Sequence, residues 1–122
     1  MVRADAWKVV TDGSNQGRSG YFLQPYLGEE SGGKANWTPE GLRDVLEVGL
    51  CDGWQVMVHT NGDAAVEFAL CAMEDLLPHH PAGDLRHRFE HVSFSTDDQL
   101  TRMAAAGISP SFLMNHVYFW GA

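Results

Sequence analysis

The chain has 122 residues, of which 44% are apolar and 20% are charged, a mixture typical of one folded domain or part of one. Eight basic and sixteen acidic residues give a net charge of −8, which disfavours binding to the phosphates of nucleic acids. No apolar run approaches the roughly 18 residues of a membrane span. The two cysteines form no CxxC pair, so we expect a reducing compartment, the cytoplasm, with neither a disulfide scaffold nor a membrane partner.

Short apolar runs alternate with stretches of helical periodicity along the chain. Apolar, β-branched runs of about five residues predict strands, and apolar residues at 3.6-residue spacing behind capping residues predict helices. In chain order, we expect a strand at 7–11, a helix from Thr38-Pro39 to Leu50, a strand at 54–59, a helix from Asp63 to Leu77, a strand at 86–92, a helix between the cap at 95–98 and Gly107, and a strand at 108–113. Pro110 makes the last strand less regular, because proline cannot donate a ladder hydrogen bond.

This alternation of strands and helices predicts an α/β fold with a parallel sheet and right-handed crossovers. Residues 13–37 depart from it, because they are rich in Gly and Ser and lack periodicity. A loop of this length is a lid, a binding loop or a disordered segment. It follows the carboxyl end of the first strand, where α/β folds bind their ligands. Residues 1–122 show no linker or repeat and are expected to form a single unit.

Two histidines end neighbouring predicted strands. His59 closes the second strand and His91 lies at the end of the third, so both side chains are expected over one edge of the sheet. Neutral imidazoles placed side by side suit Zn²⁺ or a similar divalent ion. The alternative is that each is a polar strand-end residue bonded to a loop carbonyl. If His91 points into a barrel, Arg88 and Glu90 of the other parity point toward the helices.

Lys8 and Asp12 are the polar residues of the first strand and its exit. A lysine inside an apolar strand is costly unless it is paired or functional. The alternative is an edge-strand lysine whose ammonium reaches water. Asp12 begins a tight Asp-Gly-Ser exit and has three possible roles: a turn former, an anchor for a histidine or a catalytic carboxylate.

His116 lies in an aromatic-rich stretch, residues 115–120, that follows the fourth strand. Aromatic side chains beside a polar group suit a substrate pocket. They are equally compatible with an apolar core whose cover lies elsewhere.

Together these segments resemble the YtcJ-like branch of amidohydrolase family 3. The motifs follow one another in family order over nearly the whole chain. They are Lys8-Val9-Val10-Thr11-Asp12-Gly13-Ser14, Pro25-Tyr26, His59-Thr60-Asn61-Gly62-Asp63-Ala64-Ala65-Val66, Arg86-His87-Arg88-Phe89-Glu90-His91, and His116 with Trp120-Gly121.

Members of that family look like (β/α)₈ barrels that hold one or two divalent metals. The resemblance places Lys8 on strand four, His59 on strand five and His91 on strand six, and implies that they bind the metal, with Lys8 as a carbamate and Zn²⁺ as the expected ion. Asp12 and His116 are the candidate catalytic residues, with His116 in contact with substrate. The implied reaction is hydrolysis of a C–N bond in a small amide, N-acyl or N-formyl compound by metal-activated water.

Several family features lie outside this chain, including a His-x-His pair before strand four and an aspartate after strand eight. We therefore expect a central fragment, a partial barrel of strands four to seven, that is inactive alone. The alternative is a non-catalytic half-barrel that assembles with or binds another molecule. Open sheet edges and an inner face expected to carry Val10, Met57 and Phe89 predict a homo-oligomer.

Overall fold

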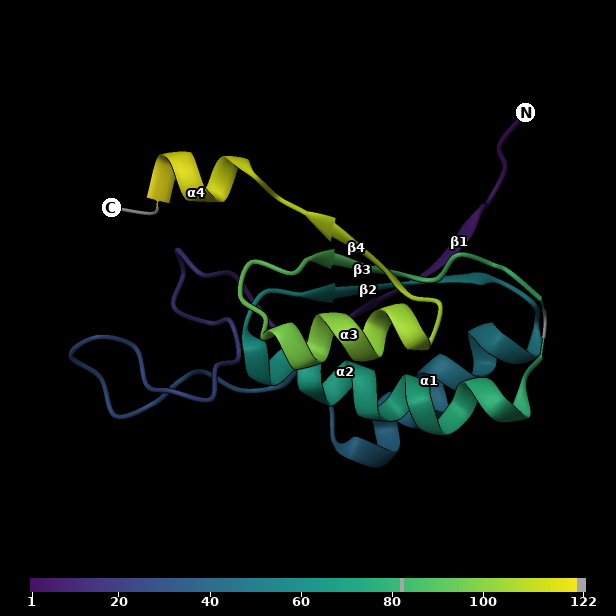
Figure 1. The fold of residues 1–122 in the computed structure, drawn as a ribbon, viewed down its shortest axis with the longest axis horizontal. Coiled ribbons are helices and arrows are strands. Elements are labelled where there is room, and N and C mark those ends of the chain that lie inside the picture. The colour runs from purple at the N-terminus through teal and green to yellow at the C-terminus, as the bar shows by residue number, and fades with distance from the viewer. Residues whose placement is uncertain (82, 121–122) are drawn as a thin grey trace.

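The computed structural model describes residues 1–81 and 83–120 as four strands, four α-helices and a short 3-10 helix (Figure 1). In chain order these are β1 (Ala6–Val10), α1 (Pro39–Cys51), β2 (Gln55–Thr60), α2 (Asp63–Leu76), η1 (Leu77–His79), β3 (Arg88–His91), α3 (Asp97–Ala105), β4 (Ser109–Phe112) and α4 (Asn115–Trp120). The predicted elements are present with small shifts of their ends. The short helix α4 is an addition that the sequence pattern did not predict.

The four strands form one parallel sheet in the order β1-β2-β3-β4. Each strand pairs with the next one along the chain. The helix between two strands returns the chain to the end of the sheet where the next strand begins. The predicted α/β class is therefore confirmed. Because the strands are parallel, all four of their carboxyl ends lie at the same end of the sheet, called the carboxyl edge. The ligand-binding loops of such folds gather there.

The core fills the space between the sheet and helices α1, α2 and α3, which lie on one face of it (Figure 1). Full burial of an apolar side chain of this size contributes roughly 1.5–3 kcal/mol before entropy is counted. Among the described residues, the largest fully buried side chains of this layer are Leu42, Leu46, Val56, Val58, Val66, Leu70, Met73, Phe89 and Met103.

Helix starts lie where the capping residues predict them. The Thr38 side chain accepts the backbone N–H of Gly41 at 3.1 Å at the start of α1. At α3, Thr96 and Gln99 form a capping box, in which each side chain accepts the backbone N–H of the other residue. These bonds satisfy donors that a helix N-terminus otherwise leaves unpaired.

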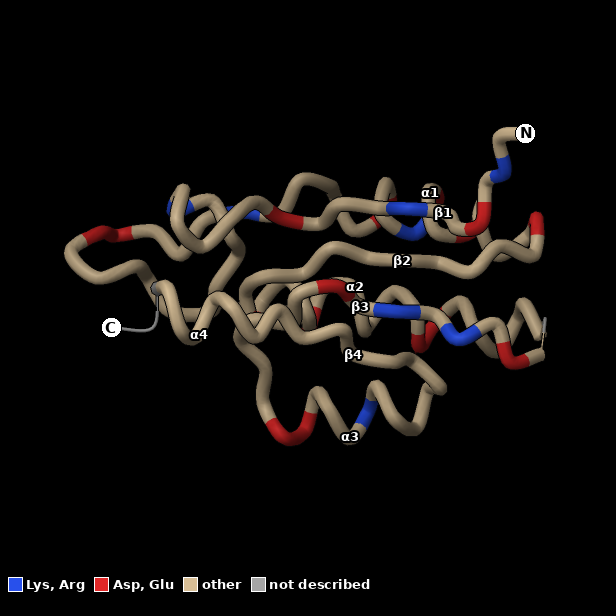
Figure 2. The backbone as a smooth tube through the Cα atoms, turned by 90° about the horizontal axis from the view of Figure 1, so that it is seen from above, with Lys and Arg blue, Asp and Glu red and all other residues tan. Residues whose placement is uncertain are grey.

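The opposite face of the sheet carries no described helix, and charged side chains lie on it. Register pairs Val58 with Phe89, and both rest in the helix-side core, whereas Met57 pairs with Arg88 on the open face. Arg88 and Glu90 form an ion pair there, with Nη2 and Oε1 2.6 Å apart. Figure 2 looks onto this face and shows basic positions on both β1 and β3. This open face is the one expected from the sequence to be the inner face of the barrel. The prediction that Phe89 lies on it, with Arg88 and Glu90 toward the helices, is therefore wrong.

Residues 11–38 contain no helix or strand and form a long loop beyond the carboxyl end of β1 (Figure 1). The two ends of this loop are held together. The backbone N–H of Asn36 donates to Thr11 O at 2.8 Å, and its side-chain amide donates to Val10 O and Asp12 O. The Trp37 indole N–H donates to Val10 O at 2.8 Å. The predicted loop is thus similar to an Ω-loop: its two ends, residues 10–12 and 36–37, are hydrogen-bonded to each other and form a closed base.

Cys51 and Cys71 are both free thiols at exposed positions. Within residues 1–81 and 83–120, none of the helices combines the length and apolarity needed to cross a bilayer.

Candidate metal centre

Two imidazole rings meet at the carboxyl edge of the sheet. His59 lies near the end of β2 and His91 is the last residue of β3. Their ring centroids are 4.6 Å apart and their planes cross at 74°. The expectation that the two side chains lie side by side is confirmed.

The backbone of His91 is unusual and accounts for this contact. Strict alternation along β3 would place His91 on the helix side together with Phe89. Instead His91 has φ 75° and Val92 has φ 40°, in the left-handed region that residues other than glycine rarely adopt. His91 keeps its place in the sheet, but the alternation of side chains ends at Glu90, and the His91 ring lies next to that of His59. Backbone of this kind is often found at functional sites.

Asp12 is buried at the exit of β1, with 1% of its surface exposed. Its Oδ2 accepts the backbone N–H groups of Tyr21 at 2.9 Å and Gly62 at 3.0 Å, and its Oδ1 accepts that of Asn61 at 3.0 Å. The carboxylate thereby ties the long loop to the turn that follows His59. Backbone donors occupy both oxygens, as the turn-forming role requires, and the 3.4 Å distance between Oδ1 and His59 Nε2 agrees with a histidine anchor. The catalytic role of Asp12 stays a prediction.

The same region orients the His59 ring. Its Nε2 lies 2.9 Å from Gly13 O and 3.4 Å from Asp12 Oδ1. The Asn61 side-chain amide lies 3.0 Å from the same nitrogen and donates to Gly13 O at 2.7 Å. These three contacts surround Nε2 and fix the orientation of the ring, and a neutral ring held in this way can bind a cation through Nδ1.

His116 reaches the centre from α4. Its Nε2 lies 3.3 Å from the Gln16 side-chain amide, and its Nδ1 lies 3.1 Å from Ser93 Oγ. Ser93 Oγ in turn donates to Asn61 Oδ1 at 3.0 Å. The His116 ring stacks on that of His91, with centroids 6.3 Å apart and planes at 17°. The structure therefore gathers His59, His91 and His116 at one edge.

Lys8 lies on the open face of β1, two residues before Val10 and therefore further from the carboxyl edge than His59. In the sheet register it pairs with Met57, whereas Val10 pairs with His59. Partial desolvation lowers the pKa of the Lys8 ammonium, the charge of Glu90 opposes the shift, and Arg88 adds to it. Lys8 is exposed rather than buried, as in the alternative of an edge-strand lysine that reaches water.

The histidine pair fits part of a cation site. Burial, with the neighbouring His59 and Lys8 as further causes, lowers the pKa of His91, which favours the neutral imidazole that binds metals. In the described part of the chain, no group of three or more His, Cys, Asp or Glu side chains is placed to hold an ion. Zinc sites use about four ligands. His59 and His91 therefore supply two nitrogen donors, and a complete site needs further donors.

Sequence reasoning missed Asn61 and Ser93, which link the rings. Asn61 stands in the His-Thr-Asn-Gly-Asp turn, where its place directly after a strand end was the only available signal. Ser93 follows the end of β3 in the same way. Their bonding depends on how three loops pack together, which no local pattern specifies.

The fold is similar to parts of two larger solved structures. An uncharacterized metal-dependent hydrolase from Pyrococcus horikoshii OT3 is 29% identical, and the match covers 86% of this chain and 20% of that protein, with a TM-score of 0.73. An uncharacterized metal-dependent hydrolase from Pyrococcus furiosus is also 29% identical, with 91% and 22% covered and a TM-score of 0.76. The four-stranded sheet thus corresponds to a partial barrel, and the chain spans about a fifth of either hydrolase.

Residues 1–121 match the amidohydrolase family, and the chain belongs to that family. No curated protein matches the sequence.

Proposed function

We propose that this chain is the sector of a metal-dependent amidohydrolase barrel that supplies the imidazole ligands His59 and His91. The proposed reaction of the whole barrel is hydrolysis of a C–N bond in a small amide, N-acyl or N-formyl compound. The observation that carries the proposal is the 4.6 Å approach of the two rings at the carboxyl edge of a parallel sheet. Family membership and the similar fold of two metal-dependent hydrolases support it.

When bound, a divalent cation, with Zn²⁺ as first choice, supplies an activated water and polarises the substrate carbonyl. The residues of this chain hold and orient that site. Gly13 O, the Asp12 carboxylate and the Asn61 side-chain amide surround Nε2 of His59 and orient its ring, and Nδ1 is the nitrogen proposed to bind the ion. His116, held by hydrogen bonds with Ser93 and Gln16, is placed to contact a substrate bound beside His91.

Lys8 is proposed as an additional oxygen donor in the form of a carbamate. The Lys8 ammonium repels a metal. After it loses a proton, the neutral amine adds CO₂ and releases a second proton, which leaves an anionic carbamate with oxygen donors. Its position on the open face, in the layer adjoining His59, is compatible with this role. Mass spectrometry under native conditions, with and without bicarbonate, tests it: a gain of one CO₂ that Lys8→Arg abolishes is the expected result. A carbamate that forms equally in Lys8→Arg would contradict the assignment.

With only two imidazoles, the isolated chain is expected to bind metal weakly and not to turn over substrate. Titration with Co²⁺, followed by absorption spectroscopy, and with Zn²⁺, followed by calorimetry, tests the ligand assignment. The double variant His59→Asn with His91→Asn is expected to lose binding. The matched control is His79→Asn with His80→Asn. It removes the last residue of η1 and the residue after it, and it is expected to bind metal like the parent chain. A tight site that survives the first double variant would refute the proposal.

A further inference from the structure

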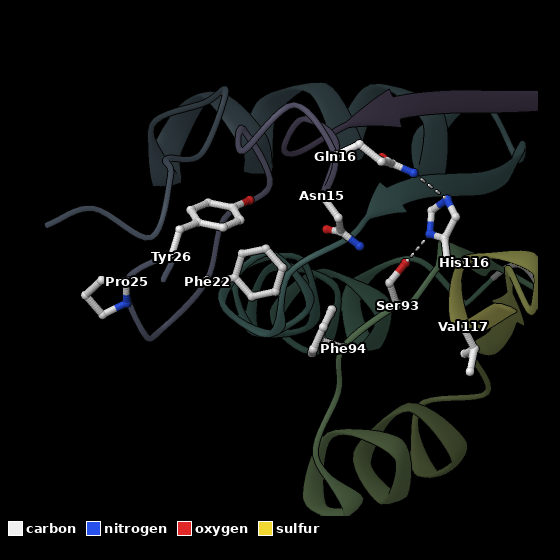
Figure 3. A pocket seen from close by; sticks show the side chains of 9 residues that line it. All are labelled: Asn15, Gln16, Phe22, Pro25, Tyr26, Ser93, Phe94, His116 and Val117. Carbon is white, nitrogen blue, oxygen red and sulfur yellow. Dashed lines mark hydrogen bonds between the residues drawn. The ribbon is translucent and has the colours of Figure 1, made fainter. Parts of the chain in front are cut away.

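A cavity of about 660 Å³, lined in part by His116, lies between the long loop and α4 (Figure 3). This volume falls within the range of about 300–1,000 Å³ that is typical of small-molecule sites. The loop supplies one wall, and the segment after β3 together with α4 supplies the other. The cavity is thus formed by the parts of the chain that follow the carboxyl ends of three strands.

One end of the cavity is aromatic. Phe22 contacts Tyr26 and Phe94, with ring centroids 5.1 Å apart in both pairs and interplanar angles of 70° and 79°. Edge-to-face packing of this kind fixes the rings before a ligand arrives. Phe94 nevertheless leaves 56% of its surface exposed, and exposed aromatic surface inside a concavity indicates an interaction site.

The other end of the cavity is polar and faces the candidate metal centre. Figure 3 shows Gln16, Ser93 and His116 together at that end, joined by hydrogen bonds, with Phe22 and Tyr26 away from them. His116 connects the cavity to His91, because their rings stack at 6.3 Å. A ligand that fills the cavity therefore extends from the aromatic rings toward the imidazoles.

The lining also restricts the charge of the ligand. None of the described residues that line the cavity is Asp, Glu, Lys or Arg. The tip of the long loop and the start of α3 carry acidic residues, but these lie outside the lining (Figure 2). A charged group placed among the rings would lose hydration without gaining a counter-ion, which is costly. An uncharged aromatic ring has little hydration to lose and packs against the rings of the lining.

We propose that this cavity binds a neutral aromatic group of the amide substrate, with the amide directed toward His116 and His91. The inference deepens the proposed function and rests on it. Its content is a substrate class: uncharged compounds with an aromatic ring near the amide, in preference to small aliphatic amides or to ring compounds with a charged end.

Three matched ligands test the class by saturation-transfer and titration NMR on the metal-free chain. 3-Phenylpropanamide has the ring and a neutral amide, propanamide lacks the ring, and 3-phenylpropanoate replaces the amide with a carboxylate. The first is expected to bind, with transfer strongest to its ring protons, and the other two to bind at least about tenfold more weakly. Equal binding of the carboxylate, or no binding of the phenyl amide, would overturn the proposal.

Two variants and a control locate the binding site. Phe94→Ala removes an exposed ring and Val117→Phe fills the cavity from α4, and each is expected to weaken 3-phenylpropanamide binding about tenfold. Tyr118→Ala removes an aromatic side chain that is 84% exposed on the same helix but outside the lining, and is expected to change nothing. Unchanged affinity in Val117→Phe overturns the proposal even if Phe94→Ala fails to fold.

The metal titration separates this inference from the function on which it rests. In the His59→Asn variant, which leaves His91 and His116 in place, 3-phenylpropanamide is expected to bind as in the parent chain while Co²⁺ binding is lost. Metal binding through the two histidines without any aromatic binding would leave the proposed function standing and overturn the substrate class. Aromatic binding in the parent chain without histidine-dependent metal binding would do the reverse.

Discussion

The buried carboxylate of Asp12 accepts the backbone N–H of Gly62 at 3.0 Å, so the end of β1 is bonded to the turn that follows β2. The same carboxylate accepts the backbone N–H of Tyr21 from the long loop. Three segments of the chain therefore meet on one side chain, directly behind His59. The position of the imidazole depends on this junction as well as on the strand that carries it.

Removal of this junction is expected to destabilise the fold. Asp12→Ala leaves buried backbone donors of Tyr21, Asn61 and Gly62 without acceptors, and we expect a loss of roughly 3 kcal/mol in the free energy of unfolding. Urea unfolding followed by circular dichroism measures it. Asp44→Ala, at an exposed position of α1, serves as the control and is expected to change stability by less than about 0.5 kcal/mol. Equal effects of the two variants would contradict the anchoring role.

Gly62 is required by space rather than by backbone conformation. Its φ is −86°, which any residue adopts, but an added Cβ would lie 1.8 Å from the carbonyl oxygen of Tyr21. Gly62→Ala must therefore displace the backbone of the long loop, and we expect a cost of about 1–3 kcal/mol. Thermal unfolding measures it, with Gly41→Ala as the control. At Gly41, in α1, an added Cβ lies 3.3 Å from the Thr38 side-chain oxygen, and alanine favours the helix by about 0.5–1 kcal/mol, so no comparable loss is expected.

His87 is expected to make stability depend on pH. It is 7% exposed, and its Nδ1 accepts the backbone N–H of Val56 at 3.0 Å, so the folded state requires a neutral ring. Burial lowers the pKa of His87, against the opposing charge of Asp84. Above about pH 6.5 both folded and unfolded chains carry a neutral ring and the stabilisation is complete. Below it the unfolded chain binds the proton first, so stability falls, by at most about 1.4 kcal/mol per pH unit from this group.

Urea unfolding between pH 7.5 and 5.5 measures this dependence. His87→Gln keeps an acceptor for Val56 but cannot titrate, and its stability is expected to fall less over this range than that of the parent chain. His79→Gln, at an exposed position, is expected to leave the parent slope unchanged. Parallel pH curves for the parent chain and His87→Gln would show that another group causes the dependence.

The isolated chain is expected to self-associate, as proposed from the sequence. Among the described strands, β1 and β4 each pair with only one neighbour, so both leave an edge of unpaired backbone groups. Light scattering after size exclusion is expected to give a dimer or larger species. Ser109→Lys places a charge on the β4 edge and should reduce association, whereas Ser31→Lys in the loop should not. A soluble monomer of 13.5 kDa would contradict the expectation.

Much of the fold was predictable because local signals agreed with the global arrangement. Threonine caps marked α1 and α3, and apolar runs marked the strands. The meeting of His59 and His91 was also predictable, since parallel strands end at one edge of a sheet. Which side chains of β3 face the helices was not predictable. The prediction was inferred from His91, and the left-handed backbone at that residue breaks the alternation. No residue type in the segment signals this conformation.

The cavity was only partly predictable, for a different reason. His116 and the aromatic stretch around it indicated a pocket, but the partners Phe22 and Phe94 come from two other loops. Their contact depends on the Asp12 junction and on the closed base of the long loop, both of which are tertiary. Spacing along the chain carries no information about such pairs.

The closed base of the long loop has a consequence for how such a protein can diversify. Because Asn36 and Trp37 donate hydrogen bonds to Val10, the end of β1 is held next to the start of α1 whatever the length of the loop between them. Doubling the length of a flexible loop costs only about 0.6 kcal/mol in closure entropy. Insertions and deletions between the two fixed ends can therefore reshape the aromatic wall. His59 and His91 are carried by the strands, so they keep their place while substrate preference drifts, as long as Gly13 and Tyr21 keep their bonds to His59 and Asp12.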